Sequence, residues 1–139
     1  AQDQSRYCIR DAGLFRTMLR THQAWKDQGD KLDAKYIGRE TLREVGRECY
    51  KIQRFCPHVE IDAFEIGGKP SDKPEDIAAE GFTEVTIYID AERWLQVGTE
   101  LHRTEPDGTR VLVGRYFMRD VQLNPTFPPD VFTVEGIKK

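Results

Sequence analysis

The chain has 139 residues, a length typical of one domain with a hydrophobic core of its own. Its net charge of −3 is spread over interspersed acidic and basic residues, without the basic stripe of a nucleic-acid binder. No run of 18 apolar residues occurs, which argues against a membrane span. We therefore expect one globular domain over residues 1–139. Because the chain begins at Ala1 rather than Met, we also expect that upstream residues have been removed.

The first predicted element is an amphipathic helix over residues 11–28. Asp11 is suited to the N-cap, and Gly29 is a typical residue just beyond a helix end. Between them, apolar and aromatic side chains recur at helical spacing: Leu14, Phe15, Met18, Leu19, His22 and Trp25. We expect this face of the helix to pack against another layer.

Residues 34–56 can be read as a helix or as two strands. Gly38 and Gly46 are poor helix residues, so we favour strands over residues 34–43 and 47–56. Residues 57–81 are rich in proline and glycine and are predicted to be an irregular insertion. Within this insertion, proline at a first helical position followed by two acidic residues predicts a short helix over residues 74–80.

The last third of the chain predicts an antiparallel meander. Apolar and polar residues alternate along residues 82–90, and the apolar pattern continues over residues 94–104 and 110–123. The sequence Glu105-Pro106-Asp107-Gly108 has the proline and glycine of a type I turn. Together with the helix, these strands indicate an α+β fold in which an amphipathic helix lies on a curved antiparallel sheet.

The final strand is apolar on both predicted faces. One face carries Val111, Val113, Phe117 and Val121, and the other carries Leu112, Tyr116 and Met118. A half-buried antiparallel strand has apolar residues on one side only. We therefore expect this strand to be covered on one side by helix and on the other by sheet, ligand or partner.

A pattern of strands and turns also carries a family resemblance. The pattern runs from Tyr88 through Val97, and continues through Pro106-Asp107-Gly108, Tyr116, residues 120–125, Phe127, Asp130 and Phe132. An earlier Gly46-Arg47 turn precedes a strand with Cys49 and Tyr50. Over residues 34–133 the chain resembles LolA-like domains of the lipoprotein-carrier superfamily, and more closely a branch of them found in planctomycetes. It departs from the pattern at Gln96, where proline is expected, and lacks strands before the first helix.

The resemblance implies an incomplete, curved half-barrel whose concave face holds lipid, acyl chains or apolar peptide, outside the cytoplasm in the periplasm. The absent strands indicate either a fragment or a short barrel completed by a partner. We expect a non-catalytic binding domain for a lipid, acyl chain or other apolar ligand, without a cofactor. The candidate ligand-binding residues are Phe15, Met18, Trp94, Tyr116 and Met118, although aromatic residues and methionines more often belong to the core.

The three cysteines do not predict a metal site. Cys49, Cys56 and His58, with Cys8, lack the CxxC pair that structural zinc sites usually have. On one extended strand, Cys49 and Cys56 would lie roughly 23 Å apart, whereas a disulfide spans about 7 Å at most. Buried free thiols and a disulfide to Cys8 both remain open.

Two other functions are weighed against ligand binding. One is an accessory subunit that docks on a protein partner through an open sheet edge or the tail over residues 125–129. The other is a cofactor-free enzyme that uses the half-barrel cavity, with His58, Glu60 and Asp62 alternating on one strand face. For these three residues we favour an ordinary solvated strand face.

Overall fold

The computed structural model describes residues 14–61, 73–130 and 133–134. Its elements are helix α1 (Leu14–Gln28), the 3-10 helix η1 (Gly29–Lys31), strands β1 (Asp33–Leu42) and β2 (Arg47–Glu60), helix α2 (Pro74–Glu80), and strands β3 (Phe82–Asp90), β4 (Gln96–Thr104) and β5 (Arg110–Phe117). The chain therefore has an α+β fold, as predicted.

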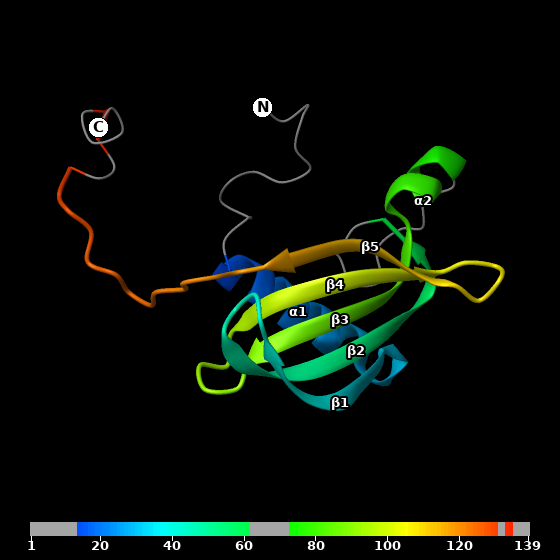
Figure 1. The fold of residues 1–139 in the computed structure, drawn as a ribbon, viewed down its shortest axis with the longest axis horizontal. Coiled ribbons are helices and arrows are strands. Elements are labelled where there is room, and N and C mark those ends of the chain that lie inside the picture. Colours follow the sequence, from blue (N-terminus) through cyan, green and yellow to red (C-terminus); the bar gives the residue numbers. More distant parts are fainter. Residues whose placement is uncertain (1–13, 62–72, 131–132, 135–139) are drawn as a thin grey trace.

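The five strands form one antiparallel sheet in which each strand pairs with the next along the chain (Figure 1). Strands β1 and β5 are the two ends of this order and do not pair, so the sheet is open. Helix α1 runs diagonally across one face of the twisted sheet, and none of the described helices covers the other face (Figure 1). Below, these are called the helix face and the polar face.

Alternation along β3 gives the two faces their different character. Val85 and Ile87 are buried on the helix face, together with Leu101 of β4. The residues that alternate with them along β3, Glu84 and Thr86, point to the polar face, where they are also buried. Because strand side chains alternate between faces, this strand separates an apolar layer from a buried polar layer.

Both edge strands contain a bulge. The pairing of β1 with β2 skips Ile37, and the pairing of β5 with β4 skips Val113. An extra residue bends the strand and increases its local twist. In the sequence, the only signal of the two bulges is the glycine that follows each bulged residue, Gly38 and Gly114. The second bulge reverses the side-chain pattern expected for the last strand.

The predicted faces of the last strand are wrong because of this bulge. Val113 packs with Leu101 on the helix face, whereas Phe117 packs with Tyr88 on the polar face. A strict two-residue period placed Val113 and Phe117 on the same side. The strand is apolar on both sides, but its apolar residues are distributed differently from the prediction.

Two predicted strand ends also need correction. Strand β5 ends at Phe117 rather than at residue 123, because Asp120 and Asn124 have positive φ angles of 52° and 49°, which an extended strand cannot contain. Strand β2 continues to Glu60, into the range expected to be irregular, because Glu60 pairs with Phe82 of β3. Strand β4 begins at Gln96, two residues later than predicted.

The remaining boundaries lie close to the predictions. The short helix over residues 74–80 and strand β3 have the predicted bounds, and β1 is shifted by one residue. Helix α1 ends at Gln28 as expected, while residues 11–13 of its predicted range lie outside the described residues. No helix in the described part of the chain is long and apolar enough to cross a membrane.

Candidate functional site

An apolar cavity of about 200 Å³ lies between helix α1 and the sheet. Its helix wall consists of Met18, Thr21, His22 and Trp25. These positions follow the three- and four-residue spacing of a single helix face. The sheet and the turn after β3 supply the rest: Ile52, Ile87, Ile89, Trp94 and Gln96. The cavity therefore lies where the apolar face of the predicted helix meets the apolar face of the sheet.

The isoleucine floor of the cavity follows from strand register. Ile52 of β2 lies opposite Ile87 of β3, and Ile89 is two residues further along β3 on the same face. Branched side chains at such positions are held in few rotamers and form a firm surface. The floor is thus rigid, and the helix side contributes the more flexible side chain of Met18.

Trp94 closes the cavity from the turn between β3 and β4. Its φ angle is +59°, a left-handed conformation that is unusual for a bulky residue. The turn holds this conformation through Asp90: one carboxylate oxygen accepts the backbone N–H groups of Glu92 and Arg93, both at 2.9 Å. The backbone N–H of Trp94 donates to the Asp90 carbonyl, also at 2.9 Å. Strained residues of this kind are concentrated at functional sites.

Asp90 is ionised, and its carboxylate oxygens are bonded within the protein. Burial opposes its charged form, but the two backbone N–H donors and the Arg47 guanidinium outweigh burial, so the pKa of Asp90 lies below its usual value. Arg47 donates Nε to Asp90 and a second nitrogen to Glu92 on the surface. The turn that presents Trp94 is therefore stabilised by a buried charge.

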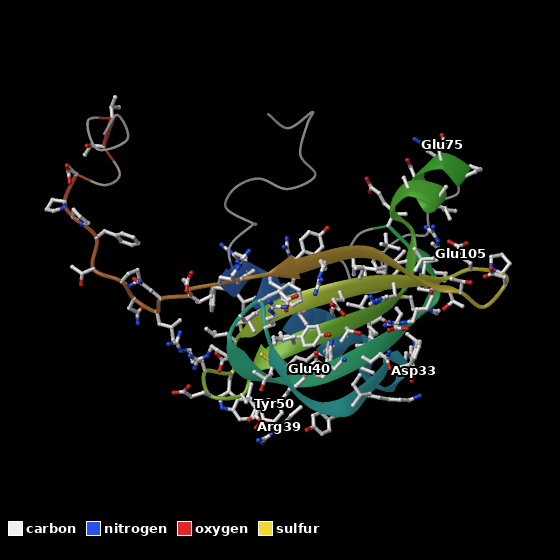
Figure 2. The ribbon with its side chains drawn as sticks, viewed as in Figure 1. Asp33, Arg39, Glu40, Tyr50, Glu75 and Glu105 are labelled. Carbon is white, nitrogen blue, oxygen red and sulfur yellow. The ribbon has the colours of Figure 1, made fainter. Side chains whose placement is uncertain are left out.

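A stack of side chains supports Trp94 from outside the cavity. The rings of Trp94 and Tyr50 are stacked with centroids 5.1 Å apart and an interplanar angle of 27°. The Arg39 guanidinium lies 4.6 Å from the Tyr50 ring centroid, and its Nη2 donates to the Tyr50 hydroxyl at 2.9 Å. Figure 2 shows Arg39 and Tyr50 together at one end of the sheet. Tyr36 contacts Tyr50 edge-on, with ring centroids 6.2 Å apart.

The structure brings two of the five candidate ligand-binding residues together. Met18 and Trp94 line the cavity. Phe15 lies on α1 with 70% of its surface exposed, and Tyr116 is half exposed on the helix-face side of β5. Met118 follows the end of β5 and lines a separate groove with Arg47 and Asp120. Binding by these residues remains a prediction.

Sequence reasoning missed most of the cavity lining. Trp25 belonged to the predicted helix stripe and could have been chosen on that ground. Ile52, Ile87 and Ile89 carry only the signal of buried strand residues, which is the same for core and for pocket. Pairing register, which places them opposite the helix, cannot be read from one sequence.

The polar face carries a second group of titratable side chains, most of which bond to one another, although the buried Nδ1 of His102 has no hydrogen-bond partner among the described residues. Glu84 accepts from Arg110 and Gln53, and these bonds keep the pKa of Glu84 below its usual value despite its burial. The Tyr88 hydroxyl donates to Glu100 at 3.0 Å. Burial, followed by the charge of Arg110, lowers the pKa of the neighbouring His102. These contacts describe a network that holds the strands together.

The enzyme alternative depends on the carboxylate of Glu60, which is held in an ion pair. Glu60 is buried rather than solvated. Its two carboxylate oxygens accept hydrogen bonds from both terminal nitrogens of Arg54, at 2.7 and 3.0 Å. The second carboxylate of the predicted cluster, Asp62, lies outside the described residues. A carboxylate held in a buried bidentate ion pair is not available as a general base without breaking that pair.

The cysteines and the potential metal-binding side chains form no second site in the described part of the chain. Cys49 and Cys56 are free thiols, and Cys8 lies outside the described residues. Within residues 14–61, 73–130 and 133–134, no three His, Cys, Asp or Glu side chains are grouped to hold a metal ion. Burial raises the pKa of Cys56 to about 12, so this thiol is a poor nucleophile at neutral pH.

Comparisons with known proteins found no relative. No family model matches the chain, and neither a curated protein nor a solved structure matches it.

Proposed function

We propose that this protein is a non-catalytic binding domain that takes an apolar chain, such as an acyl chain, into the cavity between α1 and the sheet. The observation that carries the proposal is the cavity itself, which is lined by Met18, Trp25, Trp94 and three isoleucines. Ligand sites are typically concave, mainly apolar and furnished with a few polar groups. Here His22, Thr21 and Gln96 are the polar groups.

The size of the cavity limits what can enter. An apolar cavity of roughly 150 Å³ accepts a benzene molecule. A cavity of about 200 Å³ therefore suits one ring or a short length of hydrocarbon chain, and not a whole two-chain lipid. Exposed apolar residues nearby on α1 and the turn, Phe15, Leu19 and Trp94, extend the apolar surface for the rest of a chain.

The resemblance to LolA-like half-barrels supports the same proposal, including a location outside the cytoplasm. In that superfamily the apolar side of a curved open sheet binds acyl chains next to helices. The open five-stranded sheet and the helix across its apolar face fit this architecture.

The accessory-subunit alternative finds support in the tail and not in the sheet edges. Leu123 and Phe127 expose more than half of their surfaces after the end of β5. In contrast, both edge strands contain a bulge, a feature that protects edges from pairing with another chain. Sedimentation analysis would favour this alternative if it found a stable complex that is lost when Leu123 and Phe127 are replaced by serine.

Intrinsic fluorescence tests the binding proposal directly. The chain has two tryptophans, and both line the cavity, so a ligand that enters must change their emission. Titration with an uncharged amphiphile such as dodecyl maltoside, below its micelle concentration, should give a saturable change. Ile52→Phe should weaken binding at least tenfold by filling the cavity. The matched control Leu112→Phe adds the same ring to an exposed position opposite His102, on the polar face.

Equal affinities for the two variants would refute the cavity as the binding site. The absence of any saturable fluorescence change with amphiphiles, for a protein that is folded by circular dichroism, would refute the proposed function.

A further inference from the structure

A polar groove adjoins the apolar cavity. The groove has a volume of about 530 Å³, and its charged and aromatic lining consists of Arg39, Arg47, Glu48, Tyr50, Asp90 and Glu92. The Tyr50–Trp94 stack is the wall that the two share: Trp94 lines the cavity and Tyr50 lines the groove, with ring centroids 5.1 Å apart. A molecule that crosses this wall passes from an apolar to a charged surface within a few ångströms.

The charges of the groove divide into a fixed group and an available group. The Asp90 carboxylate is only 2% exposed and is already bonded to two backbone N–H groups and to Arg47. The other four charged side chains are more accessible: Arg39, Arg47, Glu48 and Glu92. Arg47 is the least exposed of the four, and its Nε remains bonded to Asp90, so it offers a ligand only its terminal nitrogens. The available group therefore contains two guanidinium groups and two carboxylates, which makes it neutral as a whole.

These surface ion pairs are weak enough for a ligand to replace them. Arg39 contacts Glu48 at 3.3 Å, and both side chains are about half exposed. Exposed pairs of this kind contribute little to stability, since solvent and salt screen them. Guanidinium groups bind phosphate or carboxylate oxygens, and carboxylates suit an ammonium group.

We propose that the ligand of this domain is an amphiphile with a zwitterionic headgroup, an oxyanion linked to an ammonium group. The inference rests on the proposed function, because the apolar cavity holds the tail. Arg39 and Arg47 bind the oxyanion, and Glu48 and Glu92 bind the ammonium group beside Tyr50. The fixed Asp90 adds a third carboxylate to the groove against two arginines, so a purely anionic headgroup would be repelled overall.

Four probes with the same tail separate the head from the cavity. They are dodecylphosphocholine, dodecyl maltoside, dodecyl phosphate and dodecyltrimethylammonium, each titrated below its micelle concentration by tryptophan fluorescence. The expected result is that dodecylphosphocholine binds at least tenfold more tightly than each of the other three. Glu48→Gln combined with Glu92→Gln should reduce its affinity to that of dodecyl maltoside. Arg110→Gln, on the polar face of the sheet, should leave it unchanged.

Each other result has a distinct meaning. Equal binding of all four probes would overturn the headgroup inference and leave the proposed function in place. Tightest binding of dodecyl phosphate or of dodecyltrimethylammonium would also overturn it, because it would show a site for a single charge. Binding of none of the probes would overturn the proposed function as well.

Discussion

Replacement of Trp94 by glycine and by alanine separates backbone strain from side-chain contacts. Trp94 is 64% exposed, so it buries about a third of a side chain that offers roughly 250 Å². At about 25 cal/mol per Å², this burial contributes about 2 kcal/mol. The stack on Tyr50 adds about 1 kcal/mol. Both variants lose these contributions, so each should unfold about 2–3 kcal/mol more easily than the wild type.

The two variants differ in the backbone. Alanine at a φ angle of +59° keeps the left-handed penalty, which is about 1–2 kcal/mol for a residue with a Cβ atom. Glycine removes this penalty but gains about 0.4–1 kcal/mol of conformational entropy in the unfolded chain. We therefore expect Trp94→Gly to be more stable than Trp94→Ala by about 0.5–1 kcal/mol.

Urea unfolding followed by far-ultraviolet circular dichroism measures this difference without depending on tryptophan emission. Ala91→Gly in the same turn is the matched control, because Ala91 is not among the residues with positive φ. This control should lose stability. If Trp94→Ala is as stable as Trp94→Gly, the left-handed conformation does not cost what the backbone geometry implies. If either variant binds dodecyl maltoside like the wild type, Trp94 is not a wall of the site.

Three other predictions concern buried groups. Glu60→Gln leaves the Arg54 charge, which is 4% exposed, without its counterion, and should cost about 3–5 kcal/mol in urea unfolding; a loss below about 1 kcal/mol would contradict the buried pair. The lowered pKa values of Asp90 and Glu84 contribute stability that is complete above their unfolded pKa values near 4 and is lost as pH falls through the lower folded values. Unfolding midpoints should thus decline below about pH 4, and Asp90→Asn should reduce that decline. The lowered pKa of His102 adds an earlier decline that begins as pH falls below its unfolded pKa near 6.5. Cys56, with a pKa of about 12, should react with a disulfide reagent at pH 8 far more slowly in the folded protein than in urea; equal rates would show that the thiol is accessible.

The sequence predicts the layers of this fold better than its surfaces. Hydrophobic spacing locates α1 and β3 correctly, because burial of one side imposes a period that propensity alone does not. The short helix at Pro74 follows from its proline and acidic first turn. These features depend on neighbours in the chain, and so a single sequence contains them.

The errors arise where contacts between distant residues decide the structure. Val113 is followed by a glycine, Gly114, which is compatible with a bulge, but the pairing with β4 decides that the bulge forms there. Glu60 looked like a solvated carboxylate because its ion-pair partner, Arg54, carries no pattern that links the two. In the same way, Met118 was grouped with Tyr116 on the assumption of a continuous strand, and the positive φ angle of Asp120 ends that assumption.

The difference between the two faces of the sheet explains how a cavity can exist on the helix face. Each pair of neighbouring strands is joined on the polar face by a side-chain hydrogen bond or ion pair. These contacts are Lys51–Glu40, Gln53–Glu84, Tyr88–Glu100 and Arg115–Glu100.

Because a one-residue slip would move every side chain to the opposite face, such polar pairs fix the strand register independently of α1. The isoleucines opposite α1 are then held in place by the sheet and do not need close packing against the helix to stay aligned. If the strand register depended on packing against α1, a gap at this interface would weaken the register. Here the polar contacts fix the register, so the cavity on the apolar face does not disturb the pairing of the strands.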